Sequence, residues 1–501
     1  MPFLFKLNPD TTEENAPVFN LRVWLLEQIL RPRMNTSAGY AVLIAIALLV
    51  ASYIGVGRWS AASQLLALVV LGPLMVGSML QIRVGIPFIL MLSFLVPLFH
   101  RLDHSLPHSL LVDITIMALV FGVWVKQVFY RDWTFIKSPA VYAIAFWISF
   151  CIFQLVNPSL SSWLSWVYSV RSLAFYWLLV PVALFAFTQT RYVQSWLQFF
   201  LALAFLAGMY GLYQYVVGFQ EFEWSWLYSH PSKFGSVITA KGYRFFSVLG
   251  TPGSLGMTLA VGGLLALIFG LQPDQSSIKR VMYLVVAVFM LLGILISGSR
   301  TAFVVVPVGY LVWLATTWRK DILLLGVGFA ALWLAILFAP IDTLLIDRMQ
   351  DTVQFDRLDV MTKERENQDF VQPYIQSHPL GNGIGSTGES GQIFSPHNLL
   401  SQFPPNSGYV QIAVEAGWLG LFFYFGVLSI MLWCSVRAIF RLRRDTSERI
   451  LAAGLLGILL MLIIANYPQK ALIDFPTNLV FPLIVGSIIQ LGRIGPQAPK
   501  K

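Results

Sequence analysis

Charge is what this sequence has least of. Only 11% of its 501 residues are Asp, Glu, Lys or Arg, whereas 57% are hydrophobic. Soluble domains carry about 25% charged residues, so this composition excludes an ordinary soluble domain and indicates an integral membrane protein. No cleavable signal peptide is predicted, because Asp10, Glu13 and Glu14 precede the first apolar run, which is itself long enough to span a bilayer.

Cysteine is almost absent as well. Cys151 and Cys434 are the only two, and both lie inside apolar runs, which supports neither a disulfide framework nor a metal site. No zinc-ligand spacing, glycine-rich phosphate loop or Ser-His-Asp signature stands out. The net charge of +9 does not indicate nucleic-acid binding, because the basic residues are scattered between the apolar runs, as expected for signals of membrane topology.

Apolar runs of the length that spans a bilayer recur along the whole chain. They predict an all-α, polytopic helical bundle with about 14 transmembrane helices, within a range of roughly 12–14. Residues 20–30 precede the first run and are typical of an interfacial amphipathic helix. The runs lie at residues 39–57, 62–81, 84–99, 109–127, 139–157, 172–188, 195–218, 250–271, 281–297, 301–318, 322–339, 407–435, 450–466 and 476–492.

The basic residues predict the orientation of the chain. If the spans alternate from a cytoplasmic N-terminus, most of the 33 Lys and Arg residues fall in the loops of the inner side. Both termini are therefore expected in the cytoplasm. The long polar stretch that begins near residue 341 is expected outside.

This stretch, residues 341–420, is the one long polar interval in the sequence. It cannot lie in hydrocarbon, and its mixed charges with spaced apolar residues predict an ordered amphipathic helix rather than disorder. We therefore divide the chain into a cytoplasmic N-terminal segment (1–38), N-terminal spans (39–234), a catalytic region (235–435) that includes an extracytoplasmic loop (340–404), and C-terminal spans with a cytoplasmic tail (436–501).

Three arginines abut the predicted outer ends of spans: Arg171, Arg244 and Arg300. Arg244 and Arg300 stand in turns rich in Gly, Ser and Pro, where backbone and guanidinium can approach the same ligand. The planar, permanently charged guanidinium suits phosphate oxygens. The alternative is an arginine that marks topology or extends its side chain to the interface.

Two further residues are candidates for chemistry. His397 lies in a Pro/Asn-rich part of the outer loop, where it is either a general base or simply an exposed histidine. Glu415 lies inside an apolar run, and a carboxylate there is either functional or a helix-packing group beside Gly417 and Gly420. Asp113, near the outer end of its run, is expected to be structural.

Several stretches together resemble the O-antigen ligase and O-antigen polymerase family of bacterial membrane glycosyltransferases. Arg244, followed by Pro252 and Gly256, is similar to one family pattern. The others are residues 299–302 (Ser-Arg-Thr-Ala), 378–385 (His-Pro-Leu-Gly-Asn-Gly-Ile-Gly) and 406–421, which contains Asn406, Tyr409, Glu415 and Gly417. The resemblance covers about residues 235–425, and the N-terminal spans match only in character.

The resemblance implies transfer of a glycan from an undecaprenyl-pyrophosphate-linked donor to a hydroxyl of a glycan or lipid A-core acceptor. The resemblance also implies that the reaction takes place at the periplasmic face of the inner membrane, in lipopolysaccharide or exopolysaccharide biosynthesis. It implies no metal, nucleotide sugar or other cofactor, and it suggests other polysaccharide assembly proteins as partners. Arg244 and Arg300 are expected to hold the pyrophosphate, with Arg171 behind them. Residues of the last motif (Asn406, Tyr409 and Glu415) are expected to contact substrate.

One departure from the family pattern concerns the base. The family histidine of the last motif aligns with Asn406, which cannot take a proton, and His397 lies nine residues upstream. Either His397 takes the role or the reaction proceeds without a histidine base. Two alternatives from other classes stay open: a transporter of small anions or lipid-linked sugars, and a noncatalytic scaffold of a polysaccharide assembly complex.

Overall fold

The computed structural model describes residue 75 and residues 77–102, 109–239, 242–338, 371–402, 405–443 and 446–497, all within one compact unit, Leu74–Lys501. The predicted interfacial helix at 20–30, the run at 39–57 and nearly all of the run at 62–81 lie outside the described residues. The charged part of the outer loop, for which an amphipathic helix is predicted, lies outside them too.

The predicted all-α membrane architecture is confirmed. Eleven described helices, single or broken, are long and apolar enough to cross a membrane, and each predicted run from residue 84 onward overlaps a described helix. One of the eleven is the broken segment at residues 163–186, and the other ten lie in α4 (Ile82–Leu102), α5 (Ser109–Tyr130), α6 (Pro139–Phe153), α9 (Thr190–Val217), α12 (Pro252–Gly270), α13 (Ser277–Ser297), α14 (Arg300–Thr317), α20 (Gly417–Arg441), α21 (Ser447–Ala465) and α22 (Thr477–Ile494). A further long helix is α15 (Lys320–Phe338).

Helix α12 lies at the centre of this bundle and packs against α9, α13, α14 and α21. It begins where Thr251 Oγ1 accepts a hydrogen bond from Ser254 N at 3.1 Å, with Pro252 at its first position, a favourable helix start. Small residues allow the close packing. Gly309 of α14 and Gly457 of α21 face each other so closely that a Cβ on either one meets the carbonyl oxygen of the other.

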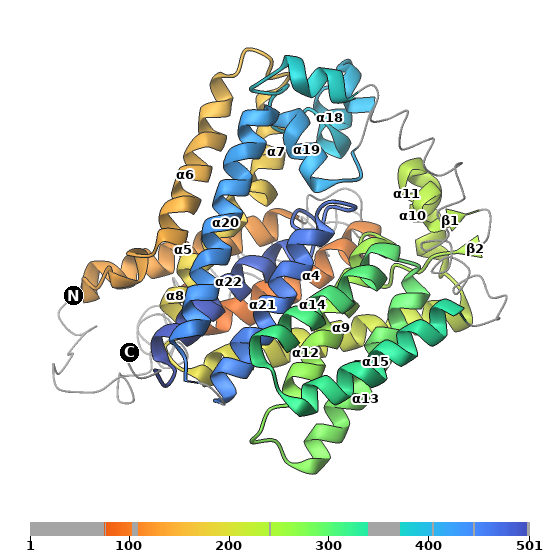
Figure 1. The fold of residues 1–501 in the computed structure, drawn as a ribbon. Helices are drawn as coiled ribbons and strands as arrows, with labels where there is room; N and C mark the ends of the chain where they lie inside the picture. Colours follow the sequence, from red (N-terminus) through yellow and green to blue (C-terminus); the bar gives the residue numbers. More distant parts are fainter. Residues whose placement is uncertain are drawn as a thin grey trace, which may run out of the picture. The chain divides into compact units, whose positions relative to one another are not determined.

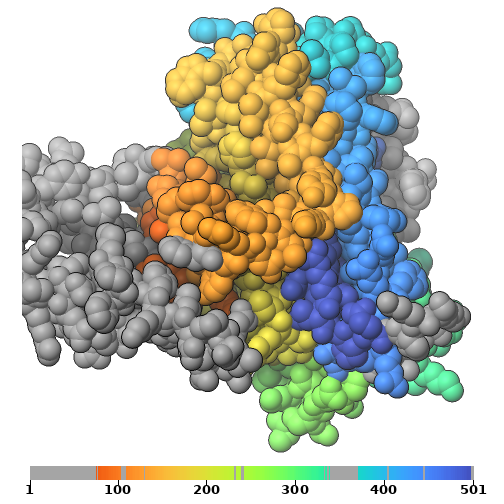
Figure 2. Space-filling model, turned by 90° about the vertical axis from the view of Figure 1, so that its left-hand side faces the viewer, coloured from red at the N-terminus to blue at the C-terminus, as the bar shows by residue number. Residues whose placement is uncertain are grey.

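A second group of helices surrounds α22, which packs against α20, α21 and the short helix α8 (Leu179–Ala186). Helix α6 runs beside α20 (Figure 1). In the space-filling view, the orange and gold surface of this part of the chain adjoins the blue surface of its C-terminal helices, where α6 contacts α20 (Figure 2).

Two predicted spans are broken. The first consists of α7 (Trp163–Leu173), a 3-10 turn (Phe175–Leu178) and α8. The second, predicted at 407–435, consists of α19 (Gly408–Glu415) and α20, and the break lies at Ala416–Gly417. Gly417 adopts φ +73°, a left-handed conformation that glycine adopts without steric cost. The sequence alone predicted continuous helices here.

The loop at residues 378–385 docks onto the break between α19 and α20. Asn382 N donates to Val414 O at 3.0 Å, and Leu419 N donates to Pro379 O at 3.3 Å. The second bond satisfies one of the backbone N–H groups that every helix leaves free in its first turn. A Cβ on Gly417 collides with Pro379 O, so glycine is required at the contact.

The connection between α6 and α7 holds the same loop from its other side. Asn157 Nδ2 donates to Leu380 O at 3.0 Å and to Gly381 O at 3.3 Å, and Gln154 Nε2 donates to Leu380 O at 3.2 Å. Helix α18 (Gly388–Phe394) then packs against α7, where Ser169 Oγ donates to Ser390 Oγ at 2.8 Å. Helices α7, α18 and α19 therefore gather at one end of the bundle (Figure 1).

We predict that Gly417→Ala destabilises the protein. The left-handed conformation alone costs an alanine about 1–2 kcal/mol, and the overlap with Pro379 adds to that. Gly426→Ala, in the same helix α20, is the matched control, because nothing lies within 4 Å of its Cβ position and alanine favours a helix. Thermal unfolding of the purified protein measures both. Equal midpoints for the two variants contradict the prediction.

Candidate functional site

The turn between α13 and α14 carries the first predicted arginine. Helix α13 ends at Gly298, which is left-handed with φ +60°, and Ser299 Oγ caps α14 by accepting from Ala302 N at 3.4 Å. Arg300 is the first residue of α14. The positive end of the helix dipole and the arginine therefore coincide, as suits an anion. Arg300 Nε is buried and has no hydrogen-bond partner among the described residues.

The side chain of Arg244, which comes from another segment, packs against the same turn. A Cβ built on Gly298 falls 3.3 Å from Arg244 Nε and 3.4 Å from its Cγ, so the arginine side chain rests on the glycine. Arg244 Nη1 donates to Ser236 O at 3.1 Å and its backbone N donates to Val237 O at 2.9 Å. The structure thus brings together the two arginines that were predicted to act together.

The segment that carries Arg244 is a small folded unit between α9 and α12. It contains α10 (Glu221–Ser229), α11 (Pro231–Val237) and an antiparallel pair of short strands, β1 (Ile238–Thr239) and β2 (Gly242–Tyr243). This unit lies in the connection between the predicted runs at 195–218 and 250–271.

A buried arginine, Arg101 at the end of α4, anchors this unit. Arg101 Nη1 donates to Ser247 O at 2.6 Å and lies 3.9 Å from Glu223 Oε1. Its guanidinium also stacks over the Phe246 ring at 4.3 Å. The sequence did not single out Arg101 or Glu223, because their pairing depends on which helix end the folded unit meets.

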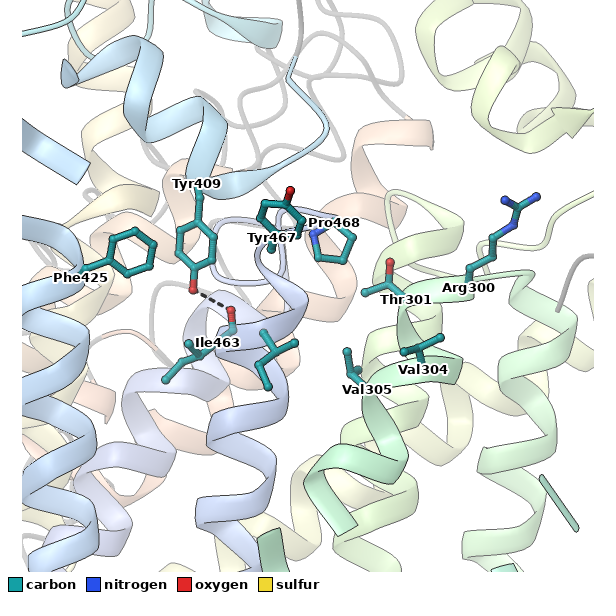
Figure 3. Close-up of a pocket in the computed structure, with 10 residues that line it drawn as sticks. Arg300, Thr301, Val304, Val305, Tyr409, Phe425, Ile463, Tyr467 and Pro468 are labelled. Atoms are coloured by element: carbon teal, nitrogen blue, oxygen red, sulfur yellow. Dashed lines mark hydrogen bonds between the residues drawn. The ribbon is translucent and has the colours of Figure 1, made fainter. Parts of the chain in front are cut away.

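An apolar pocket of about 590 Å³ lies beside Arg300. Figure 3 shows α14 on one side, with Arg300 at the rim and its guanidinium directed away from the apolar side chains. On the other side, Tyr409 donates from its hydroxyl to Ile463 O at 2.6 Å, which ties α19 to α21. The lining residues are Arg300, Thr301, Val304, Val305, Tyr409, Phe425, Ile463, Ile464, Tyr467 and Pro468.

Arg171 is held by other partners. Its Nη1 donates to Asp113 Oδ2 at 2.7 Å and to Ser109 Oγ at 2.9 Å, and its Nε donates to Tyr168 O at 2.7 Å. Tyr176 also donates to the Asp113 carboxylate, at 2.8 Å. This geometry ties α7 to α5 through Arg171 and Asp113. The predicted contact of Arg171 with substrate stays a prediction.

Glu415 is fully buried, and its carboxylate accepts three hydrogen bonds. The donors are Gly385 N at 2.9 Å, Thr387 Oγ1 at 2.5 Å and Gln411 Nε2 at 3.0 Å. The sequence left open whether Glu415 is a functional carboxylate or a helix-packing group. The geometry favours the packing group, because the carboxylate joins the loop at 385–387 to α19.

His397 and Asn406 both lie at the surface of the same end. His397 is exposed in a turn after α18, and its neighbour Asn398 donates from Nδ2 to Ser161 Oγ at 2.6 Å. Among the described residues, no contact joins His397 to Arg244 or Arg300. Asn406 is exposed and directly precedes Ser407, whose Oγ caps α19 by accepting from Val410 N at 3.3 Å.

The loop between α21 and α22, residues 466–476, was not singled out from the sequence. It supplies Tyr467 and Pro468 to the pocket beside Arg300, and it carries Lys470 and Asp474. Two opposite charges in a short proline-containing connection between two apolar runs are only a weak sequence signal of a functional site. Only the packing of this loop against α12, α18 and α19 shows that the charges face the same end of the bundle as Arg300.

The family model described as O-antigen ligase matches residues 285–425. This region contains Arg300, the loop at 378–385, His397 and Glu415, and over it the predicted resemblance is confirmed. Arg244 and the loop between α21 and α22 lie outside the match. No curated protein matches the chain at a significant level.

We predict that Glu415→Ala destabilises the protein strongly. The substitution leaves the buried donors on Gly385 and Gln411 without an acceptor, at about 1–3 kcal/mol for each unsatisfied group. Glu221→Ala is the control, because Glu221 is exposed and contributes at most about 1 kcal/mol through the helix dipole. Thermal unfolding compares the two, and a smaller loss for Glu415→Ala contradicts the role assigned to this carboxylate.

Proposed function

We propose that the protein is a glycosyltransferase of the bacterial inner membrane. It transfers a glycan from an undecaprenyl-pyrophosphate-linked donor to a hydroxyl of a glycan or lipid A-core acceptor, as an O-antigen ligase or a related polymerase. The observation that carries the proposal is the position of Arg300 at the rim of an apolar pocket, with the side chain of Arg244 packed against the turn that carries Arg300.

The two arginines suit the leaving group of such a reaction. When the bond between the sugar and the pyrophosphate breaks, negative charge develops on the phosphate oxygen. Fixed cations at that position stabilise the transition state more than the ground state. Arg300 adds the N-terminal end of α14, and its Nε has no partner among the described residues, so it is available to donate to phosphate.

The apolar pocket suits the polyprenyl chain of the donor. Val304, Phe425 and Ile464 are each 43–49% exposed, so the pocket opens to the side of the bundle, where lipid surrounds a membrane helix. Transfer of a hydrocarbon chain into such a site gains about 0.8 kcal/mol for each buried CH₂ group. A pyrophosphate that enters with its chain in this pocket reaches Arg300 at the rim.

The orientation in the membrane follows from the basic residues at the opposite end. Arg319 and Lys320 follow the far end of α14, Arg441 ends α20 and Arg493 lies in the last turn of α22. The positive-inside rule puts this end in the cytoplasm. The Arg300 end then faces the periplasm, with both termini in the cytoplasm. His397 stays the predicted base from the sequence.

We predict that Arg300→Ala and Arg244→Ala each weaken the binding of undecaprenyl pyrophosphate by about 10- to 100-fold, because each loses a charge-assisted contact worth about 1.5–3 kcal/mol. Both variants should also lose surface glycan in cells that lack the wild-type gene. Arg280→Ala is the matched control, because Arg280 is exposed near the other end of α13. Undecaprenol, which has no phosphate, should bind wild type and variants equally. Wild-type affinity and glycan in both variants exclude the arginines from the mechanism.

We predict that Val304→Trp fills the pocket and raises the Kd for undecaprenyl pyrophosphate at least about tenfold, because the chain loses apolar contacts. Leu311→Trp is the control on the same helix, at an exposed position outside the pocket. Native mass spectrometry of the purified variants measures both affinities. An unchanged Kd for Val304→Trp shows that the chain binds elsewhere.

A further inference from the structure

The loop between α21 and α22 contacts both α19, the helix that carries Glu415, and the start of α12. Asn466 O accepts from Gly408 N of α19 at 3.0 Å, and the side chain of Gln469 lies against Gly253 at the start of α12. Three residues further along α12, a Cβ on Gly256 collides with Ser299, the cap of the helix that begins with Arg300. The loop therefore packs close to the turn that carries Arg300, and its residues Tyr467 and Pro468 line the pocket beside that arginine.

Lys470 and Asp474 stand one turn apart in this loop, because Asp474 N donates to Lys470 O at 2.9 Å. Lys470 Nζ lies 3.7 Å from the position of a Cβ on Gly388, the first residue of α18. Both charged side chains are partly exposed, and neither forms a hydrogen bond or ion pair with another described residue. A half-buried charge without a hydrogen-bond partner is costly, which points to a polar ligand.

Nearby charged residues act on this pair, and one of them lies on the helix that binds Arg244. Burial raises the pKa of the Asp474 carboxyl, Lys470 and Lys233 oppose the rise, and Glu389 adds to it. Burial likewise lowers the pKa of Lys470, and the negative charges of Asp474 and Glu415 oppose this fall. Lys233 lies on α11, the helix whose Ser236 O accepts from Arg244. The Asp474 carboxyl therefore has two lysines near it, one in its own loop and one on α11.

We propose that Asp474 is the base that takes the proton of the acceptor hydroxyl, and that Lys470 is a positioning residue that keeps this carboxylate ionised. The proposal rests on the proposed glycosyl transfer. The acceptor oxygen forms a bond to the anomeric carbon of the donor sugar. The bond between that carbon and the pyrophosphate oxygen breaks, and its electron pair stays on the phosphate beside Arg244 and Arg300. The hydroxyl proton moves to an oxygen of Asp474.

The structure favours Asp474 over His397 for this step. Asp474 is partly buried, lies in the loop that supplies Tyr467 and Pro468 to the pocket, and carries a carboxylate with no donor from the described residues. A carboxylate whose pKa is raised by burial is also a stronger base than an exposed one. His397 is exposed in a turn after α18, and that turn, which the structure describes, contributes none of the residues that line the pocket.

The first test is Asp474→Asn in the full-length protein. The substrates are lipid-linked glycan and acceptor lipid extracted from the cells that make them, and the readout is release of undecaprenyl pyrophosphate. We expect the rate to fall by about 10²- to 10⁴-fold, the usual contribution of a general base, with the Kd for undecaprenyl pyrophosphate within about twofold of wild type. Asp474→Glu should recover part of the rate, and formate should partly rescue Asp474→Gly. Asp274→Asn, beyond the other end of α12, is the matched control.

The second test is the pH profile, which a merely structural role of Lys470 does not change. Asp474 acts only when ionised, so the wild-type rate is lost as the pH falls through its pKa. Removing the neighbouring positive charge in Lys470→Met raises that pKa further, because Lys233 alone then opposes burial and Glu389. We therefore expect the acid limb to move to higher pH in Lys470→Met and to stay near the wild-type position in Lys470→Arg.

Each outcome decides between the proposals. Wild-type turnover in Asp474→Asn overturns the assignment of the base. The assignment also fails if His397→Ala loses the acid limb of the pH profile while Asp474→Asn keeps the wild-type rate. Weakened binding of undecaprenyl pyrophosphate by folded Asp474→Asn also overturns it, because the residue then holds the donor. If Asp474→Asn does not fold, an acid limb that is unchanged in Lys470→Met overturns it. Absence of transfer by wild type, with both substrates present, refutes the proposed function itself.

Discussion

The contact on which the rest of this end of the molecule depends is the seating of the loop at 378–385 in the break between α19 and α20. Two left-handed glycines, Gly381 and Gly417, allow the backbones to meet, and the buried Glu415 carboxylate collects donors from both segments. Because α19 also binds α21 through Tyr409, this contact fixes one wall of the pocket beside Arg300. The geometry of the candidate site therefore follows from backbone packing more than from the charges themselves.

Three segments far apart in the sequence build the site on this framework. The unit with Arg244 is anchored by Arg101 of α4, the turn with Arg300 follows α13, and the loop with Lys470 and Asp474 precedes α22. Each cation lies near a helix end or in a connection rather than in the middle of a span. The polar groups therefore gather at one end, which suits chemistry at a membrane surface better than transport through the midplane.

The sequence predicted the helices from residue 84 onward and the shared location of Arg244 and Arg300, because apolar runs and turn composition are local signals. The break at Gly417 was not predicted, since an apolar run looks continuous until a partner such as Pro379 requires a left-handed residue. The role of Glu415 stayed open for the same reason: its partners on Gly385 and Thr387 come from another segment. Lys470 and Asp474 were not singled out because the neighbours that draw attention to them, Gly388 and Lys233, belong to other segments, which no spacing in the sequence relates to this loop.

The sideways opening of the pocket, at Val304 and Ile464, has a kinetic consequence. A carrier lipid that arrives through such an opening diffuses in two dimensions within its leaflet and never crosses bulk water. Occupancy of the site then depends on the surface density of the carrier, its mole fraction among the phospholipids. Turnover should therefore respond to dilution of the carrier with inert lipid at constant volume, and be indifferent to dilution of the vesicles with buffer.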